Sequence, residues 1–96
     1  MTAYLSKRPD ETREYALEWD ELGPAEALAE DLGWMIVPQE LDPDALTLEG
    51  AELEPTRSVA VIAGGRAGHL YHVSARVRTT RGRVLGQAVM LRVVGA

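Results

Sequence analysis

The chain has 96 residues, of which 46% are apolar and 26% charged, and it contains no cysteine. A domain of this length buries a modest core, and this composition is typical of a soluble globular protein rather than a disordered one. The absence of cysteine excludes disulfide bonds and thiolate metal sites and favours a reducing compartment. No apolar run approaches the length of a membrane-spanning helix, and residues 1–8 lack the apolar stretch of a signal peptide, so we expect no membrane partner.

Charge is distributed unevenly along the chain. Residues 1–56 contain all fifteen acids and three bases, for a net charge of −12, whereas residues 57–96 contain seven arginines and no acid, for +7. Two interpretations are open: the acidic and basic strands neutralise each other within one domain, or the acidic edge of one copy faces the basic edge of another. The overall charge of −5 and the lack of aromatic residues among the arginines argue against a nucleic-acid partner.

Residues 1–11 are predicted to form an N-terminal arm, followed by a β-sandwich domain over residues 12–96. The arm contains Pro9, which cannot donate to a strand ladder, so we expect it to be dispensable for folding. A free terminal segment often becomes ordered on a neighbouring protein. Tyr4 is therefore a candidate partner contact.

The rest of the first half predicts short strands. Apolar and polar residues alternate over 12–19, which is the period of a half-buried strand and predicts the first strand there. Residues 26–30 are rich in good helix formers and could form a helical turn. Further strand segments are predicted over 32–37, 46–49 and 51–54, with Gly50 as a turn between the last two.

The second half has the clearest pattern. Residues 58–63 are apolar at nearly every position, as expected of a central strand. Residues 71–78 alternate strictly, and Leu85, Val89, Leu91 and Val93 repeat the same inward face. The segment 80–82 between the two strands predicts a hairpin turn, with Gly82 able to adopt a positive φ angle.

Six or seven short strands with closely spaced turns predict an all-β fold, an immunoglobulin-like or fibronectin-type sandwich of about seven strands. Tyr71 stands near the start of the penultimate strand, two residues before an inward residue, which is the pattern of a tyrosine corner; a generic buried tyrosine is the alternative. The residues expected to form the structural core are Tyr15, Trp19, Trp34, Tyr71 and Val73.

The sequence offers little for catalysis or metal binding. His69 and His72 are the chain's two histidines, and no acid stands near them in sequence to orient a base or complete a zinc site. The acidic pairs lack the spacing of a calcium loop, and the glycine-rich segment 64–68 lacks the Lys-Ser/Thr pair of a phosphate loop. We therefore expect no catalytic residue, no metal and no cofactor.

Four apolar residues fall on the opposite parity from the expected core. A monomer rarely leaves a contiguous apolar patch uncovered, so such residues could form a partner surface, although isolated surface hydrophobes are the alternative. With Tyr4, the candidate partner contacts are Met35, Val37, Ile62 and Met90.

Packing and turn residues follow one another in a particular order over roughly residues 7–94. They are Lys7-x-Pro9-x-Glu11, Tyr15-x-x-x-Trp19-Asp20, Leu28 with Trp34-x-Ile36-Val37, Leu46-Thr47-Leu48, Ser58 to Gly65 with Gly68, Tyr71-x-Val73, Thr79 to Arg83, and Val89-x-Leu91-x-Val93. This order resembles the tailed-phage fiber-tail adaptor proteins.

The resemblance implies a virion structural protein of a phage, prophage or gene-transfer particle, made in the bacterial host cytoplasm. In that role several copies would join the tail or neck to fibers or neighbouring rings. Its implied partners are other virion proteins of the neck, tail and fiber, together with further copies of itself around a ring. The alternative is a free-standing recognition module that binds carbohydrate or a cell-surface protein. Such a module would be expected to carry an aromatic platform in its loops.

Overall fold

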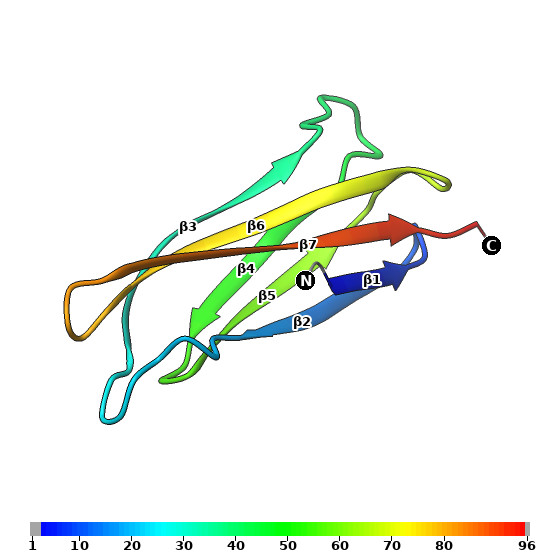
Figure 1. The fold of residues 1–96 in the computed structure, drawn as a ribbon. Helices are drawn as coiled ribbons and strands as arrows, with labels where there is room; N and C mark the ends of the chain where they lie inside the picture. The colour runs from blue at the N-terminus through cyan, green and yellow to red at the C-terminus, as the bar shows by residue number, and fades with distance from the viewer. Residues whose placement is uncertain (1–2, 96) are drawn as a thin grey trace.

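A computed structural model describes residues 3–95, which form seven strands and no helix, packed as two sheets (Figure 1). The order is β1-β7-β6-β3 in the four-stranded sheet and β2-β5-β4 in the three-stranded sheet. The prediction of an all-β immunoglobulin-like or fibronectin-type sandwich of about seven strands is confirmed. The strands are β1 (Ala3–Lys7), β2 (Thr12–Glu18), β3 (Leu28–Val37), β4 (Thr47–Leu53), β5 (Arg57–Ala63), β6 (Leu70–Thr79) and β7 (Val84–Val93).

The hairpin of β6 and β7 forms the centre of the four-stranded sheet. From Tyr71 to Val77 every second residue of β6 is apolar, and the odd-numbered residues of the strand are buried while the even-numbered ones face outward. The predicted turn follows β6, and Gly82 has a φ of 77°, a conformation that side chains with a Cβ rarely adopt. Since β6 pairs with both β7 and β3, its alternation fixes which side of the whole sheet faces the core.

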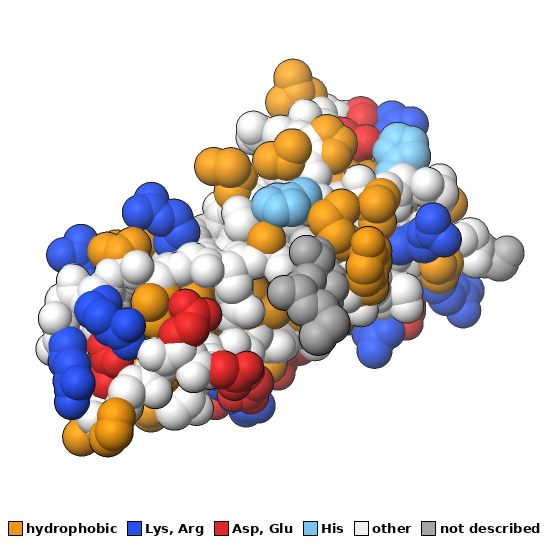
Figure 2. All heavy atoms as spheres, viewed as in Figure 1, with side chains coloured by type: hydrophobic (Ala, Val, Ile, Leu, Met, Phe, Trp, Pro, Cys, Tyr) orange, Lys and Arg blue, Asp and Glu red, His pale blue; other side chains and the backbone are white. Residues whose placement is uncertain are grey.

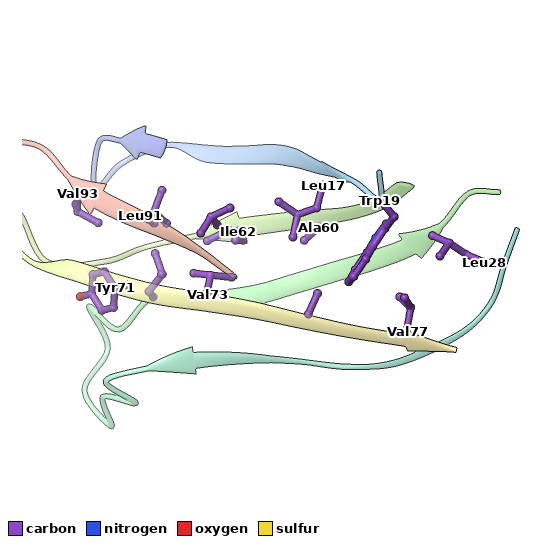
Figure 3. Packing of buried hydrophobic residues seen from close by; sticks show 13 residues of the cluster. Leu17, Trp19, Leu28, Ala60, Ile62, Tyr71, Val73, Val77, Leu91 and Val93 are labelled. Atoms are coloured by element: carbon purple, nitrogen blue, oxygen red, sulfur yellow. The ribbon is translucent and has the colours of Figure 1, made fainter. Parts of the chain in front are cut away.

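The core lies between the two sheets (Figure 3). Trp19, Tyr71 and Val73 are buried there, while Tyr15 and Trp34 are half-buried and pack against the cluster. The indole Nε1 of Trp19 donates to Ser58 Oγ at 2.9 Å, which satisfies a buried donor inside the apolar layer. These four aromatic residues are therefore used for packing between the sheets rather than for display in the loops.

The N-terminal segment does not precede the sandwich as a free arm. Residues 3–7 form β1, an edge strand that pairs in parallel with β7, so the segment 12–18 is the second strand and not the first. Lys7 is 1% exposed, and its Nζ donates to the backbone carbonyls of Arg8 and Gly64 at 2.7 and 2.5 Å. The prediction of an N-terminal arm is therefore wrong for residues 3–7. A lysine is normally exposed, but Lys7 can be buried here because the two carbonyls accept hydrogen bonds from its ammonium group.

The predicted helical turn over 26–30 is also absent, because these residues form the end of the β2–β3 connection and the start of β3. The Glu26 side chain is buried and accepts hydrogen bonds from Arg83, Thr79 and the backbone N–H of Gly23. These donors, the Arg83 guanidinium above all, hold the pKa of Glu26 well below its usual range. Leu28 then starts β3. The donors that hold Glu26 thus fasten the β2–β3 connection to the β6–β7 hairpin.

The turn predicted at Gly50 is a local irregularity instead. Residues 47–53 form one continuous strand, β4, and the pairing register with β5 shifts between Leu48 and Gly50. A β-bulge of this kind absorbs an extra residue without ending the strand. The two short strands predicted on either side of Gly50 are therefore one strand.

Candidate docking surface

The outer face of the four-stranded sheet holds a row of side chains that comes from all four strands. Tyr4 on β1 is level with Met90 on β7, Met90 with His72 on β6, and His72 with Val37 on β3. Residues level with one another across a sheet point to the same side. Since Tyr71 and Val73 of β6 point into the core, this row points away from it.

Further apolar residues flank this row on the same face. Met35 is level with Ser74 on one side of the row, and Leu70 is level with Arg92 on the other. The exposed fractions are 74% for Tyr4, 63% for Met35, 48% for Val37 and 42% for Leu70, whereas Met90 is half-buried among its neighbours. We call the surface of Tyr4, Met35, Val37, Leu70, His72 and Met90 the apolar face.

Figure 2 shows the same side of the molecule as Figure 1, with hydrophobic side chains gathered around histidine over the part where β3 and β7 end and β6 begins. Charged side chains are denser toward the β6–β7 hairpin. Hydrophobic residues scattered singly over a surface need no explanation, but a contiguous group from four strands marks a surface that a partner covers in many proteins.

The apolar face is also hollowed. One shallow hollow of about 560 Å³ is lined by Tyr4, Leu5, Ser6, Leu70 and Arg92. A smaller one of about 160 Å³ lies at the β3 end of the face and is lined by Leu32, Gly33, Trp34, Met35, Ser74 and Arg76. The pairing of β3 with β6 shifts register between Asp31 and Gly33, beside this second hollow. Such concavities can receive the side chains of another protein, since the main contact residues of many interfaces fill well-packed pockets.

The loops at one end of this face are held by a polar cluster around Tyr71. Its hydroxyl donates to Glu40 Oε1 at 2.6 Å and accepts from the backbone N–H of Arg66 at 3.0 Å, which is the backbone contact expected of a tyrosine corner. Burial, reinforced by the bond to Glu40, raises the pKa of the Tyr71 phenol. His69 Nδ1 lies 3.1 Å from Glu40 Oε2, and Arg66 pairs with Asp42 at 2.8 Å. The β3–β4 and β5–β6 loops are therefore fastened to each other.

The outer face of the three-stranded sheet is different. Glu14 on β2 is level with Val61 on β5, and Glu52 on β4 is level with Val59 on β5. The two glutamates are exposed on the edge strands, and the two valines of the central strand are shielded between them, with Val59 only 4% exposed. We call the surface of Glu14, Glu52, Val59 and Val61 the acidic face.

Of the candidate partner contacts, the structure brings Tyr4, Met35, Val37 and Met90 together and removes Ile62. Ile62 is 2% exposed and belongs to the core cluster, so its assignment to a partner surface is wrong (Figure 3). Because β5 is apolar on both sides, its parity could not be read from the sequence alone. Leu70 was missed, although its alternation with Tyr71 places it on the outer side.

The two halves of the sequence neutralise each other in part. Arg57, Arg66, Arg78 and Arg83 form ion pairs with acids of the N-terminal half. Within residues 3–95, Arg76 and Arg92 pair with no acid, and both point outward from the four-stranded sheet. Internal pairing therefore accounts for some of the charge asymmetry, and the apolar face retains unpaired positive charge.

The described part of the chain holds no group of three or more His, Asp or Glu side chains arranged to bind a metal ion. His72 lies in the apolar row, and His69 faces Glu40.

Residues 7–92 match the family described as Podophage GP4 fiber-tail adaptor protein gp77. The chain belongs to this family. The resemblance found in the sequence, over roughly residues 7–94, is thereby confirmed. No curated protein shows significant sequence similarity to the chain.

Membership in the podophage fiber-tail adaptor family supports a tail adaptor role and implies a place in the virion. An adaptor binds other tail and fiber proteins, and a structural family of this kind suggests that the chain is not an enzyme. No helix in residues 3–95 has the length and apolarity needed to cross a membrane. The matched range covers all of β2 to β6 and therefore most of both sheets.

Proposed function

We propose that the chain is a structural adaptor subunit, present in several copies, that joins the tail or neck of a phage to its fibers or to neighbouring rings. The observation that carries this proposal is the apolar face. Four residues from three different strands expose apolar side chains there, with exposed fractions from 42% to 74%. In the proposed assembly a neighbouring virion protein covers this face.

The rigidity of the scaffold supports this role. The face is built on paired strands rather than on loops, and β6 and β7 at its centre each run for ten residues. Partners that meet through preformed sheet surfaces lose little conformational entropy on binding. An adaptor of this kind needs no catalytic group, since its work is to hold two other components in fixed positions.

Particles that lack this chain provide the test. They are prepared from the phage that encodes it, and purified protein is added back before fiber attachment is scored by electron microscopy. Wild-type protein should restore the fibers. Met35→Glu should bind these particles at least about tenfold more weakly, because it places a charge in an apolar contact and a loss of 1.4 kcal/mol is tenfold in affinity.

Thr56→Glu is the matched control. Thr56 is exposed in the turn between β4 and β5, so the variant gains the same side chain away from the outer faces of both sheets. It should bind the particles like the wild type. If wild-type protein fails to restore fibers, the adaptor role is contradicted; if Met35→Glu restores them as well as Thr56→Glu does, the apolar face is not the contact.

A further inference from the structure

The apolar face carries positive charge that the chain itself leaves unneutralised. Arg78 lies 3.4 Å from Glu30, but within the described residues Arg76 and Arg92 pair with no acid. Arg92 lines the larger hollow of the face and Arg76 the smaller one. A complementary partner would therefore offer small apolar groups at the centre of the contact and carboxylates near its margins.

The acidic face of this same chain has that composition. Val59 and Val61 lie between Glu14 and Glu52 in a shallow hollow of about 230 Å³. At Gly50, which also lines it, an added Cβ would meet nothing within 4 Å, so the hollow is open on the β4 side. The stem of an arginine can lie against valine side chains while its guanidinium reaches a carboxylate.

We propose that the partner on the apolar face is a second copy of this chain, which presents its acidic face. The inference rests on the proposed function, because it names the virion protein that covers the apolar face. The two faces lie on opposite sides of one sandwich. Each copy that binds one neighbour therefore leaves its other face free, and the contact is of the head-to-tail type that generates a ring or a stack.

The size of the molecule is sufficient for such a contact. A standard protein interface covers about 800 Å² of each partner. The chain measures 44 × 23 × 18 Å, and both faces lie along its long dimension. By contrast, pairing of two apolar faces with each other would bring Arg76 and Arg92 of two copies together without acids to offset them. Charge thus favours contact between unlike faces.

Charge exchange at the two faces tests this arrangement in solution. In one variant, Arg76→Glu with Arg92→Glu makes both faces acidic; in the other, Glu14→Arg with Glu52→Arg makes both faces basic. All four residues are exposed, so circular dichroism should show both variants folded. Sedimentation velocity should show each variant alone associating at least about tenfold more weakly than the wild type. An equimolar mixture of the two should recover association, because each acidic face then meets a basic one.

Salt provides a second measurement on the wild type. Raising the salt to 1 M shortens the screening length to about 3 Å and should weaken self-association. The proposal is overturned if the wild type stays monomeric up to about 1 mM at low salt, a concentration at which even weak contacts of about −4 kcal/mol are half-formed. It is equally overturned if the basic variant associates alone like the wild type, which would show that apolar faces pair with each other, or if the mixture does not associate. A monomeric wild-type protein that still restores fibers would contradict this inference and leave the adaptor function intact.

Discussion

In both sheets buried residues alternate with exposed ones along the strands. The outer faces of the two sheets differ, however, in which strands carry their apolar side chains. On the three-stranded sheet they lie on the central strand, where Val59 is 4% exposed between Ala16 of β2 and Glu52 of β4. On the four-stranded sheet they also lie on the edge strands, where Tyr4 and Met35 are 74% and 63% exposed. The outward valines in the middle of β5 are shielded by both neighbouring strands, whereas outward apolar residues on the edge strands β1 and β3 and at the start of β6 remain available. Position within the sheet, as well as residue type, therefore decides which face can dock a partner.

Removal of β1 would have the largest effect, because it would leave three strands in each sheet and remove one of the two edge strands that carry exposed apolar residues. A chain that starts at Pro9 loses the ladder to β7, the packing of Leu5 and the buried ammonium of Lys7. We expect it to lose most of its free energy of unfolding, which is about 5 to 15 kcal/mol for a typical domain. Urea denaturation measures the loss.

Lys7→Met distinguishes the contribution of the lysine to stability from that of the strand. The variant keeps β1 but leaves the carbonyls of Arg8 and Gly64 without the ammonium donor, so it should fall between the truncated and full-length chains. A truncated chain whose melting temperature lies within a few degrees of the full-length value would show that β1 is dispensable, as the sequence alone had suggested.

Ile62→Ala compares the inner side of β5 with its outer side. Ile62 is 2% exposed between the sheets, so the variant should lose about 3 kcal/mol of stability through the lost burial and the cavity that remains. Its binding to tail particles should be unchanged once the folded fraction is taken into account. A binding defect in fully folded Ile62→Ala protein would return this residue to the docking surface.

Tyr71→Phe tests the loops that border the apolar face. The variant keeps the ring but loses the hydroxyl that joins Glu40 to the backbone of Arg66. We expect a loss of about 1 to 2 kcal/mol, because both of these groups lose a partner in a partly buried site. An unchanged denaturation midpoint would show that the hydroxyl contributes nothing to stability.

Val37→Ala should have the smallest effect on stability. Val37 is 48% exposed on the edge strand β3, so its truncation should change the free energy of unfolding by less than about 0.5 kcal/mol. Binding to tail particles should nevertheless weaken, since the side chain belongs to the apolar face. If stability falls and binding does not, the apolar face supports the fold rather than a partner.

The sequence predicts the β6–β7 hairpin well because strict alternation leaves one arrangement that buries the apolar side. It predicts β5 as a central strand but cannot say whether Ile62 or Val61 faces the core, because both sides are apolar and the neighbouring strands decide. The sequence does not predict β1 for a different reason. From the sequence Lys7 is expected to be exposed to solvent, whereas its burial depends on the carbonyls of Arg8 and of Gly64, which is distant in sequence.

The candidate docking surface shows the same division between local and long-range information. Alternation identifies Met35, Val37 and Met90 as outward-facing residues. It cannot show that Tyr4 joins them, since that depends on the parallel pairing of β1 with β7. The unpaired state of Arg76 and Arg92 likewise depends on which acids the fold brings near each arginine.

The parallel pairing of β1 with β7 also decides where a fusion tag can be attached. Ala3 is level with Val89, in the interior of β7, and the next residue, Tyr4, belongs to the apolar face. The chain leaves β7 at the opposite end of that pairing, at the tip of the sandwich (Figure 1). An affinity tag or fluorescent protein joined ahead of β1 would thus emerge beside the apolar face and obstruct a neighbour there. The same label joined after β7 would emerge beyond the sheets, which makes that end the suitable one for pull-down and for labelling of assembled particles.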